Sequence, residues 1–239
     1  MIVSLSTGSV YKVAEGILEH LHFIEKEFYG LIDGVEICFI QKENFDKFEF
    51  DQKSIDFLNS LEFNTLHAPV KETNYGKNEE TRTSFKKIRE LSKQVKFEFV
   101  TFHPNHVSDF SALSAVKNVC IENMPNGEKR KGWQYPKEFA AFFKKWSKFG
   151  FCFDVNHSIA NSIEPKEFTV NLKDKVKYIH LNATKPGNAN HDLLVESDNE
   201  TLEKIMPVFS LQKPFVIEVN IEKEKIPLLK KEIELIRKK

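Results

Sequence analysis

Histidine and carboxylate side chains recur where short apolar runs of this sequence end. In FCFDVNHSIA (Phe151–Ala160), three residues typical of a buried strand are followed by Asp154 and then by His157. Other apolar runs end in the same way, at His67, His103, Glu122, His180 and Glu218. Imidazole nitrogens and carboxylate oxygens suit zinc and manganese, and carboxylates also transfer protons in acid–base catalysis.

The apolar runs alternate with amphipathic stretches, which predicts strands separated by helices. The predicted strands are Ile2–Leu5, Gly34–Ile40, Thr65–His67, Phe97–His103, Asn118–Glu122, Phe151–Asp154, Val176–Leu181 and Phe215–Val219. The helical patterns are clearest over Val10–Phe28, Glu79–Val95, Pro136–Phe149 and the C-terminal Glu222–Lys239. Alternation of this kind is typical of parallel βαβ units.

About eight such units in 239 residues predict an α/β fold with one compact (β/α)8 TIM barrel, parallel strands inside and helices outside, forming a single domain over residues 1–239. An open doubly wound sheet is the alternative. Such a sheet usually has a GxGxxG turn after its first strand, and STGS (Ser6–Ser9) lacks that spacing.

The C-terminal ends of parallel barrel strands meet at one end of the barrel, so these polar side chains should converge there. Carboxylates held close together repel, which raises the pKa of some of them unless a cation lies between them. A divalent metal removes that conflict. The pattern therefore predicts a metal centre, and the alternative is a barrel that has lost its metal.

Three further groups of residues carry predictions of their own. His191, in the loop Ala183–Leu194 after the seventh strand, is an additional ligand candidate, with an ordinary solvated histidine as the alternative. His20 and His22 lie within the first helical pattern and are expected at the surface. Cys38, Cys120 and Cys152 each lie in an apolar run, which predicts buried free thiols rather than disulfides.

Composition narrows the possible partners. Lys+Arg and Asp+Glu both total 35, a formal net charge of +0, which disfavours attraction of nucleic acid or acidic membrane by bulk charge. The first residues, MIVSLS, have neither a basic lead nor a long apolar stretch, so we expect no signal peptide, no membrane association and a cytoplasmic protein. No protein partner is implied.

The residues resemble the xylose-isomerase-like TIM barrels, which include endonuclease IV and many sugar isomerases and epimerases. The matching motifs are HAP (His67–Pro69), FHP (Phe102–Pro104), EN (Glu122–Asn123), DVNH (Asp154–His157), HLN (His180–Asn182), the loop His191 and IE (Ile217–Glu218). They extend from the third strand to the eighth, so they cover most of the chain. Each motif is short, but their order and placement are specific to the superfamily.

Resemblance to endonuclease IV implies three zinc ions and cleavage of DNA beside abasic sites. His67, His103 and Glu122 would hold one ion, and Glu122 would bridge to a second held by Asp154, His180 and Glu218. His157 and His191 would hold the third, together with an aspartate two residues before the loop histidine. Ala189 stands at that position, with Asp192 nearby, so the third site is incomplete.

Resemblance to the sugar isomerases and epimerases implies one manganese or magnesium ion. Glu122, Asp154, His180 and Glu218 match their ligand set, and Glu122 and Glu218 would be the catalytic residues that move protons beside a carbonyl. Glu36 resembles an acidic residue that many of these enzymes carry on the second strand; its alternative is a structural carboxylate paired with a lysine. Asn123 and Asn182, beside the ligands, are further candidates for binding substrate.

The extra histidines favour hydrolysis of abasic-site DNA over isomerisation of a sugar or sugar phosphate. The loop NGEKRKGW (126–133) supplies Lys129, Arg130 and Lys131 as candidate phosphate contacts. However, Val70 and Lys71 replace the residues that endonuclease IV relatives insert into DNA, and Tyr75 is the nearby aromatic substitute. A barrel that binds metal or a sugar phosphate without turnover is the third possibility.

Overall fold

Parallel strands close into a barrel in the computed structural model, which describes residues 1–126, 132–184, 187 and 190–239. In these residues the closed order is β1-β2-β3-β4-β5-β6-β7-β8, and every neighbouring pair is parallel. The strands are β1 Val3–Ser6, β2 Gly34–Cys38, β3 Thr65–His67, β4 Phe99–Phe102, β5 Val119–Glu122, β6 Gly150–Asp154, β7 Val176–Leu181 and β8 Phe215–Ile217. The predicted (β/α)8 barrel is confirmed.

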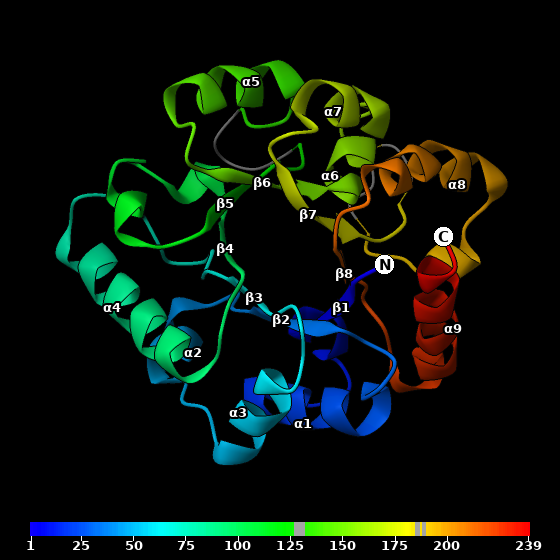
Figure 1. The fold of residues 1–239 in the computed structure, drawn as a ribbon, viewed down its shortest axis with the longest axis horizontal. Coiled ribbons are helices and arrows are strands. Elements are labelled where there is room, and N and C mark those ends of the chain that lie inside the picture. The colour runs from blue at the N-terminus through cyan, green and yellow to red at the C-terminus, as the bar shows by residue number, and fades with distance from the viewer. Residues whose placement is uncertain (127–131, 185–186, 188–189) are drawn as a thin grey trace.

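Helices surround the barrel on all sides (Figure 1). The α-helices are α1 Ile17–Phe28, α2 Lys42–Lys47, α3 Gln52–Asn59, α4 Glu79–Gln94, α5 Pro136–Lys145, α6 Val155–Ala160, α7 Pro165–Leu172, α8 Asn199–Ile205 and α9 Ile226–Arg237. The short 3-10 helices are η1 Thr7–Val10, η2 Pro104–His106, η3 Ala112–Ala115, η4 Leu194–Glu196, η5 Met206–Leu211 and η6 Lys223–Lys225.

The first helix begins later than its amphipathic pattern predicts. The pattern starts at Val10, but α1 starts at Ile17, because Gly16 has a φ of 91° and cannot continue a right-handed helix. His20, expected at the surface, is buried, and its Nε2 lies 2.9 Å from the carbonyl oxygen of Ala14 in the turn before the helix. That prediction was wrong because the irregular turn folds back over the helix.

Alternate residues of each strand face opposite sides of the barrel wall. The larger apolar core lies between the wall and the helices, and residues such as Leu66, Phe151 and Phe153 belong to it. A second, smaller core consists of Phe63, Cys120, Cys152, Tyr178 and Val216. The parity of this second set matches that of His67, Glu122, Asp154 and His180, so the same side of each strand supplies the barrel filling and the polar residues above it.

Gly34 shows how tightly two strands approach at the base of the barrel. A Cβ built on Gly34 would lie 1.6 Å from the carbonyl oxygen of Phe63 and 2.5 Å from Ser4 Oγ. No side chain fits there, so glycine is required for β2 to pass the start of β3.

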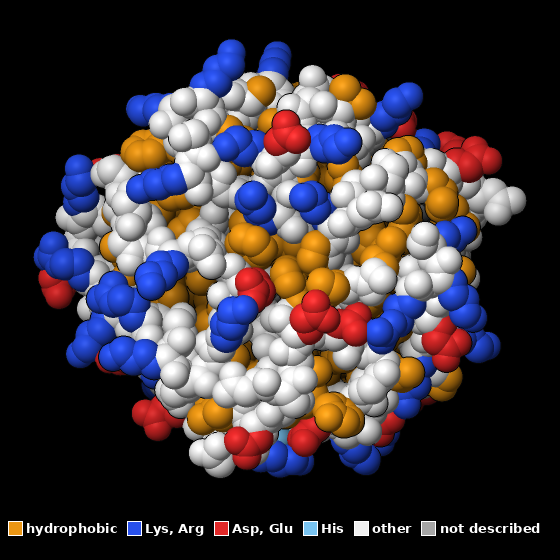
Figure 2. Space-filling view, in the orientation of Figure 1, with side chains coloured by type: hydrophobic (Ala, Val, Ile, Leu, Met, Phe, Trp, Pro, Cys, Tyr) orange, Lys and Arg blue, Asp and Glu red, His pale blue; other side chains and the backbone are white. Residues whose placement is uncertain are grey.

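The outer surface has mixed charge. Figure 1 looks onto the ends where the strands begin, and Figure 2 shows Lys and Arg side chains interleaved with Asp and Glu around that face. This pattern agrees with the formal net charge of +0. Within the described residues, every helix is too short or too polar to cross a lipid bilayer.

Candidate metal centre

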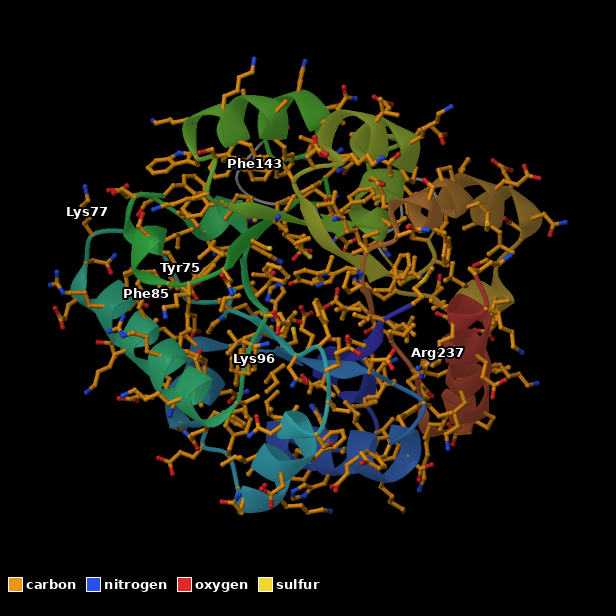
Figure 3. The ribbon with its side chains drawn as sticks, in the orientation of Figure 1. Tyr75, Lys77, Phe85, Lys96, Phe143 and Arg237 are labelled. Atoms are coloured by element: carbon orange, nitrogen blue, oxygen red, sulfur yellow. The ribbon has the colours of Figure 1, made fainter. Side chains whose placement is uncertain are left out.

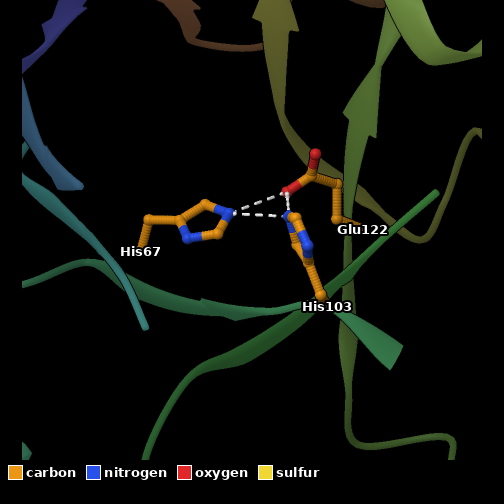
Figure 4. Close-up of side chains that lie close together, drawn as sticks. All are labelled: His67, His103 and Glu122. Carbon is orange, nitrogen blue, oxygen red and sulfur yellow. Dashed lines mark hydrogen bonds and ion pairs between the residues drawn. The ribbon is translucent and has the colours of Figure 1, made fainter. Parts of the chain in front are cut away.

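His67, His103 and Glu122 converge at the C-terminal ends of β3, β4 and β5 (Figure 4). The Nε2 atom of His67 lies 3.1 Å from His103 Nε2 and 3.1 Å from Glu122 Oε2. His103 Nε2 lies 3.4 Å from the same carboxylate oxygen. Ligand atoms bonded at about 2.0–2.1 Å to one tetrahedral ion lie roughly 3.3 Å apart, so the three atoms match the spacing of a shared metal.

The second oxygen of Glu122 faces a different group of side chains. Glu122 Oε1 lies 3.6 Å from His180 Nδ1, which in turn lies 3.4 Å from Glu218 Oε2 and 3.9 Å from Asp154 Oδ2. Asp154 and His180 are direct register partners on β6 and β7, which explains why they meet. One carboxylate therefore joins two clusters of possible ligands.

Two atoms of the second cluster support a metal at this position. His180 Nδ1 and Asp154 Oδ2 are buried and have no hydrogen-bond partner among the described residues. Buried polar atoms are almost always paired, because an unpaired one costs about 1–3 kcal/mol. A divalent cation between them would satisfy both, so the residues present fit a metal ion.

The cluster opens to solvent at two of its members. The side chains of His103 and Glu218 are 15% and 16% exposed, whereas those of Glu122, Asp154 and His180 are exposed by 2% or less. A substrate entering from the end of the barrel would therefore meet His103 and Glu218 first.

His157 belongs to the same cluster through α6, whose first turn Asp154 caps. Asp154 Oδ1 accepts the backbone N–H of His157 at 2.8 Å, and the imidazole Nδ1–H donates to the carbonyl oxygen of Asn123 at 2.7 Å. Since Nδ1 carries the proton in that arrangement, the lone pair of the neutral ring lies on Nε2, which is the nitrogen available to a metal.

His191 is held in the same way from the loop after β7. Its Nδ1 lies 2.8 Å from the carbonyl oxygen of Glu218, and its ring centre is 6.4 Å from that of His157. Within the described residues His191 belongs to no group of three close ligands. Ala189 lies outside the described residues, and Asp192 is exposed, so a third metal site stays a prediction.

The side chains of the cluster shift one another's pKa values. Burial raises the pKa of Glu122, but its interactions with His103 and His180 outweigh burial and hold that pKa well below its usual value. Burial lowers the pKa of His157, but Asp154 and Glu122 outweigh it and raise the pKa to about 9. Burial alone dominates at His103, whose pKa is lowered, and at Glu218, whose pKa is raised.

Glu36 lies beneath this cluster, completely buried in the barrel. Its two carboxylate oxygens are each 3.1 Å from His180 Nε2. Thr65 Oγ1 and Tyr178 OH donate to its Oε2 at 2.9 Å and 3.1 Å. The partner of this carboxylate is thus a histidine, not the lysine considered from the sequence.

Asn123 and Asn182 also have partners inside the protein. Asn123 Nδ2 donates to the carbonyl oxygen of Asp154 at 2.7 Å, and its Oδ1 accepts the Asp154 N–H at 2.8 Å, which clamps β5 to β6. Asn182 accepts a hydrogen bond from Asn156 and lies 3.2 Å from the ring of His191. Both are fully buried, and their contact with substrate stays a prediction.

Two features considered for binding DNA have different outcomes. Lys129, Arg130 and Lys131 lie outside the described residues. Tyr75 is buried beside Phe85 (Figure 3). It also packs against Phe102, and its hydroxyl donates to the carbonyl oxygen of Pro69 at 2.9 Å. Tyr75 is therefore part of the core that packs α4 on the barrel and does not project toward DNA.

The sequence pattern missed residues that lie one step deeper in the barrel. Tyr178, Thr65 and Cys152 come two positions before His180, His67 and Asp154, so the same strand parity points them inward. Tyr178 OH contacts Thr101 Oγ1 as well as Glu36.

All three predicted free cysteines are confirmed as free and buried.

Comparison with solved structures finds the same barrel. A D-tagatose 3-epimerase-like protein matches at 20% identity with a TM-score of 0.67, over 100% of this chain and 99% of that chain. Endonuclease IV from Thermus thermophilus matches at 15% identity with a TM-score of 0.70, over 100% and 99%. The IOLI protein, determined with a zinc atom, matches at 13% identity with a TM-score of 0.65, over 100% and 96%.

These likenesses confirm the fold predicted from the sequence motifs, that of the xylose-isomerase-like TIM barrels. Identities of 20% or less do not choose among the activities of those proteins. Searches against protein-family models and against curated protein sequences found no match.

Proposed function

We propose that this protein is a divalent-metal-dependent hydrolase of phosphodiesters, and that DNA with an abasic site is the first substrate to test. The observation that carries the proposal is the placement of Glu122. Its Oε2 faces two histidine nitrogens and its Oε1 faces His180, which is the arrangement of a carboxylate that bridges two metals. Paired ions about 3.5–4 Å apart are common in enzymes that cleave phosphate esters.

The ligand types favour zinc. The first cluster offers two imidazoles and a carboxylate, and the second offers one imidazole with three carboxylates. Zinc accepts such mixed nitrogen and oxygen sets, whereas magnesium favours oxygen ligands and retains water. We therefore propose two zinc ions, with His157 and His191 as the candidates for a third.

Each side chain has a distinct role in the proposed reaction. Bound ions would polarise the phosphate and supply a hydroxide nucleophile near neutral pH. Glu122 would hold the two ligand clusters at a fixed separation. His103 and Glu218, the partly exposed members, would border the phosphate as it enters. Asp154 and His180 are buried, so these inner ligands would keep a fixed geometry before substrate arrives.

A nicking assay tests the proposal directly. Purified protein is incubated with a duplex oligonucleotide that carries one synthetic abasic site, with zinc or manganese, and strand cleavage is measured on a denaturing gel. Cleavage at the abasic site, lost in Glu122→Gln, is the expected result. Absence of cleavage with either metal contradicts abasic-site DNA as the substrate.

A sugar isomerase or epimerase is the second candidate, and one observation favours it. A cavity of about 570 Å³ lies beside the ends of β1 and β2, where Cys38, the register partner of His67, forms part of its wall. Glu15, Glu19 and Glu49 also line it. Carboxylates accept hydrogen bonds from hydroxyl groups and repel phosphates, so this cavity suits a neutral polyol better than a DNA backbone.

The two candidates differ in what they require of the outer histidines. An epimerase that converts a ketose with one bound metal ion needs four ligands: Glu122, Asp154, His180 and Glu218. The two-metal hydrolase needs His67 and His103 as well. Incubating the protein with a panel of free ketoses and manganese, followed by chromatography of the sugars, tests the alternative. Interconversion of any ketose together with an inactive nicking assay would select it.

A further inference from the structure

We propose that Glu36 is a positioning residue that fixes His180 with its Nδ1 atom toward the metal, and that it makes the Asp154–His180–Glu218 cluster the tighter of the two metal sites. This inference rests on the metal centre of the proposed function. It adds a role for a carboxylate that is itself too deep to touch substrate, since its side chain is 0% exposed.

The geometry of His180 leaves little choice of orientation. Its Nε2 is 3.1 Å from both oxygens of Glu36, and its Nδ1 faces Glu122, Glu218 and Asp154 at 3.4–3.9 Å. An ionised carboxylate only accepts hydrogen bonds, so Glu36 requires the proton on Nε2. The lone pair of a neutral His180 then lies on Nδ1, on the side of the three other carboxylates.

Glu36 is itself held in place by donors from two other strands of the barrel. Thr65 on β3 and Tyr178 on β7 donate to its Oε2, so these two donors and His180 all converge on one carboxylate. A carboxylate held in place by these donors fixes the orientation of the imidazole that it contacts and increases the basicity of that ring.

The two clusters differ in how their histidine rings are oriented, and this difference predicts which cluster binds metal more tightly. In the described residues, the outer cluster has His67 and His103, and the buried Nδ1 of His103 has no hydrogen-bond partner. His67 Nδ1 lies 3.1 Å from the carbonyl oxygen of Ala68, which is a neutral acceptor. Of these three histidines, His180 is the one oriented by a carboxylate, so the inner cluster should fill first.

Cobalt binding in a His67→Ala background isolates the inner cluster. Visible absorption of Co²⁺ is titrated in that protein, in His67→Ala/Glu36→Gln and in His67→Ala/Tyr178→Phe. The glutamine keeps the shape of Glu36 but removes its charge, and the phenylalanine removes a hydrogen bond to the same oxygen but keeps the ring that packs against His180. We expect cobalt affinity to fall about 10- to 100-fold with Glu36→Gln and less than about threefold with Tyr178→Phe.

Other results overturn the inference in separable ways. Equal cobalt affinity with and without Glu36→Gln contradicts the positioning role but leaves the metal centre intact. Equal losses in the Glu36 and Tyr178 variants show that general packing of the barrel is responsible. Failure of the His67→Ala reference itself to bind cobalt contradicts the metal centre on which the proposed function depends.

A measurement on the unmutated protein covers the case in which Glu36→Gln does not fold. Long-range ¹⁵N–¹H spectra of the zinc-loaded wild-type protein report which ring nitrogen of each histidine carries its proton. The inference requires His180 to be protonated on Nε2, with Nδ1 shifted by the metal. A His180 ring protonated on Nδ1 overturns it.

Discussion

At the scale of single residues, the two oxygens of Glu122 decide the interpretation of the site. Removing the Glu122 carboxylate as a ligand affects both clusters, because its Oε2 faces His67 and His103 while its Oε1 faces His180. His67, by contrast, contributes only to the outer cluster. Substituting these two residues therefore separates a two-metal chemistry from a one-metal chemistry.

We predict that Glu122→Gln abolishes activity whichever reaction the protein catalyses, with a loss greater than the roughly 100-fold that follows removal of a residue supporting a ligand. His67→Ala should be nearly as severe for hydrolysis but should cost an isomerase only about tenfold or less, because the inner ligands remain. Steady-state rates on the active substrate measure both. Equal, severe losses in a confirmed isomerase would show that His67 has been assigned wrongly.

A second prediction concerns Glu232, a buried carboxyl group on α9 away from the metal ligands. Its Oε2 accepts the backbone N–H of Val195 at 3.3 Å, and burial raises its pKa from 4.5 to about 8. The folded protein therefore keeps this proton where the unfolded chain loses it. The stability that this group contributes is complete below pH 4.5 and is lost as the pH rises through 8.

Glu232→Gln should remove that pH dependence. We expect the free energy of unfolding of the variant, relative to wild type, to improve between pH 5 and pH 8 by up to about 3 kcal/mol. Urea unfolding at several pH values measures it, with the exposed Glu234→Gln on the same helix as the control. Parallel pH profiles for wild type and Glu232→Gln would show that the carboxyl group is not protonated in the folded protein.

At the scale of elements, strand parity determined how much of the site could be predicted. The apolar runs predicted every strand to within a few residues, and the structure brings polar residues at their ends close together at one end of the barrel. The pattern did not predict how deep in the barrel each polar side chain lies. Glu36 was a candidate for binding substrate, but its register partners Thr65 and Ser6 place it lower in the barrel, beneath His180.

Irregular segments between elements were the other source of error. Residues 11–16 continue an amphipathic pattern that the positive φ of Gly16 interrupts, so the start of α1 and the burial of His20 could not be foreseen. Tyr75 was considered for DNA because of its position after the third strand. Its partners Phe85 and Phe102 come from α4 and β4, and only the folded packing shows that they bury it.

The contact between β2 and the start of β3 gives a prediction at this scale. Gly34→Ala should destabilise the protein by about 3 kcal/mol or more, because its Cβ would lie 1.6 Å from a backbone oxygen that no side-chain movement can relieve. Gly30→Ala is the matched control: no atom lies within 4 Å, and only its φ of 82° carries a cost, about 1 kcal/mol. Chemical denaturation measures both, and equal effects would contradict the close contact.

At the scale of the whole molecule, the barrel concentrates charge at one end and has a balanced surface elsewhere. Glu36, Glu122, Asp154 and Glu218 place four carboxylates in or beside the barrel, facing four histidines of the same clusters. Two divalent cations would balance those four negative charges. The formal net charge of +0 gives no long-range attraction for DNA, so recognition of any nucleic acid would depend on the metal end of the barrel.

The count of metal ions per chain tests the central claim most directly. Protein is stripped with a chelator, reloaded with excess zinc, dialysed and analysed by plasma mass spectrometry, alongside His67→Ala and Glu122→Gln. A bridging Glu122 predicts at least two zinc ions per wild-type chain, one fewer in His67→Ala, and weak or no retention in Glu122→Gln. A single ion in the wild-type protein, retained unchanged in His67→Ala, would contradict the two-metal centre.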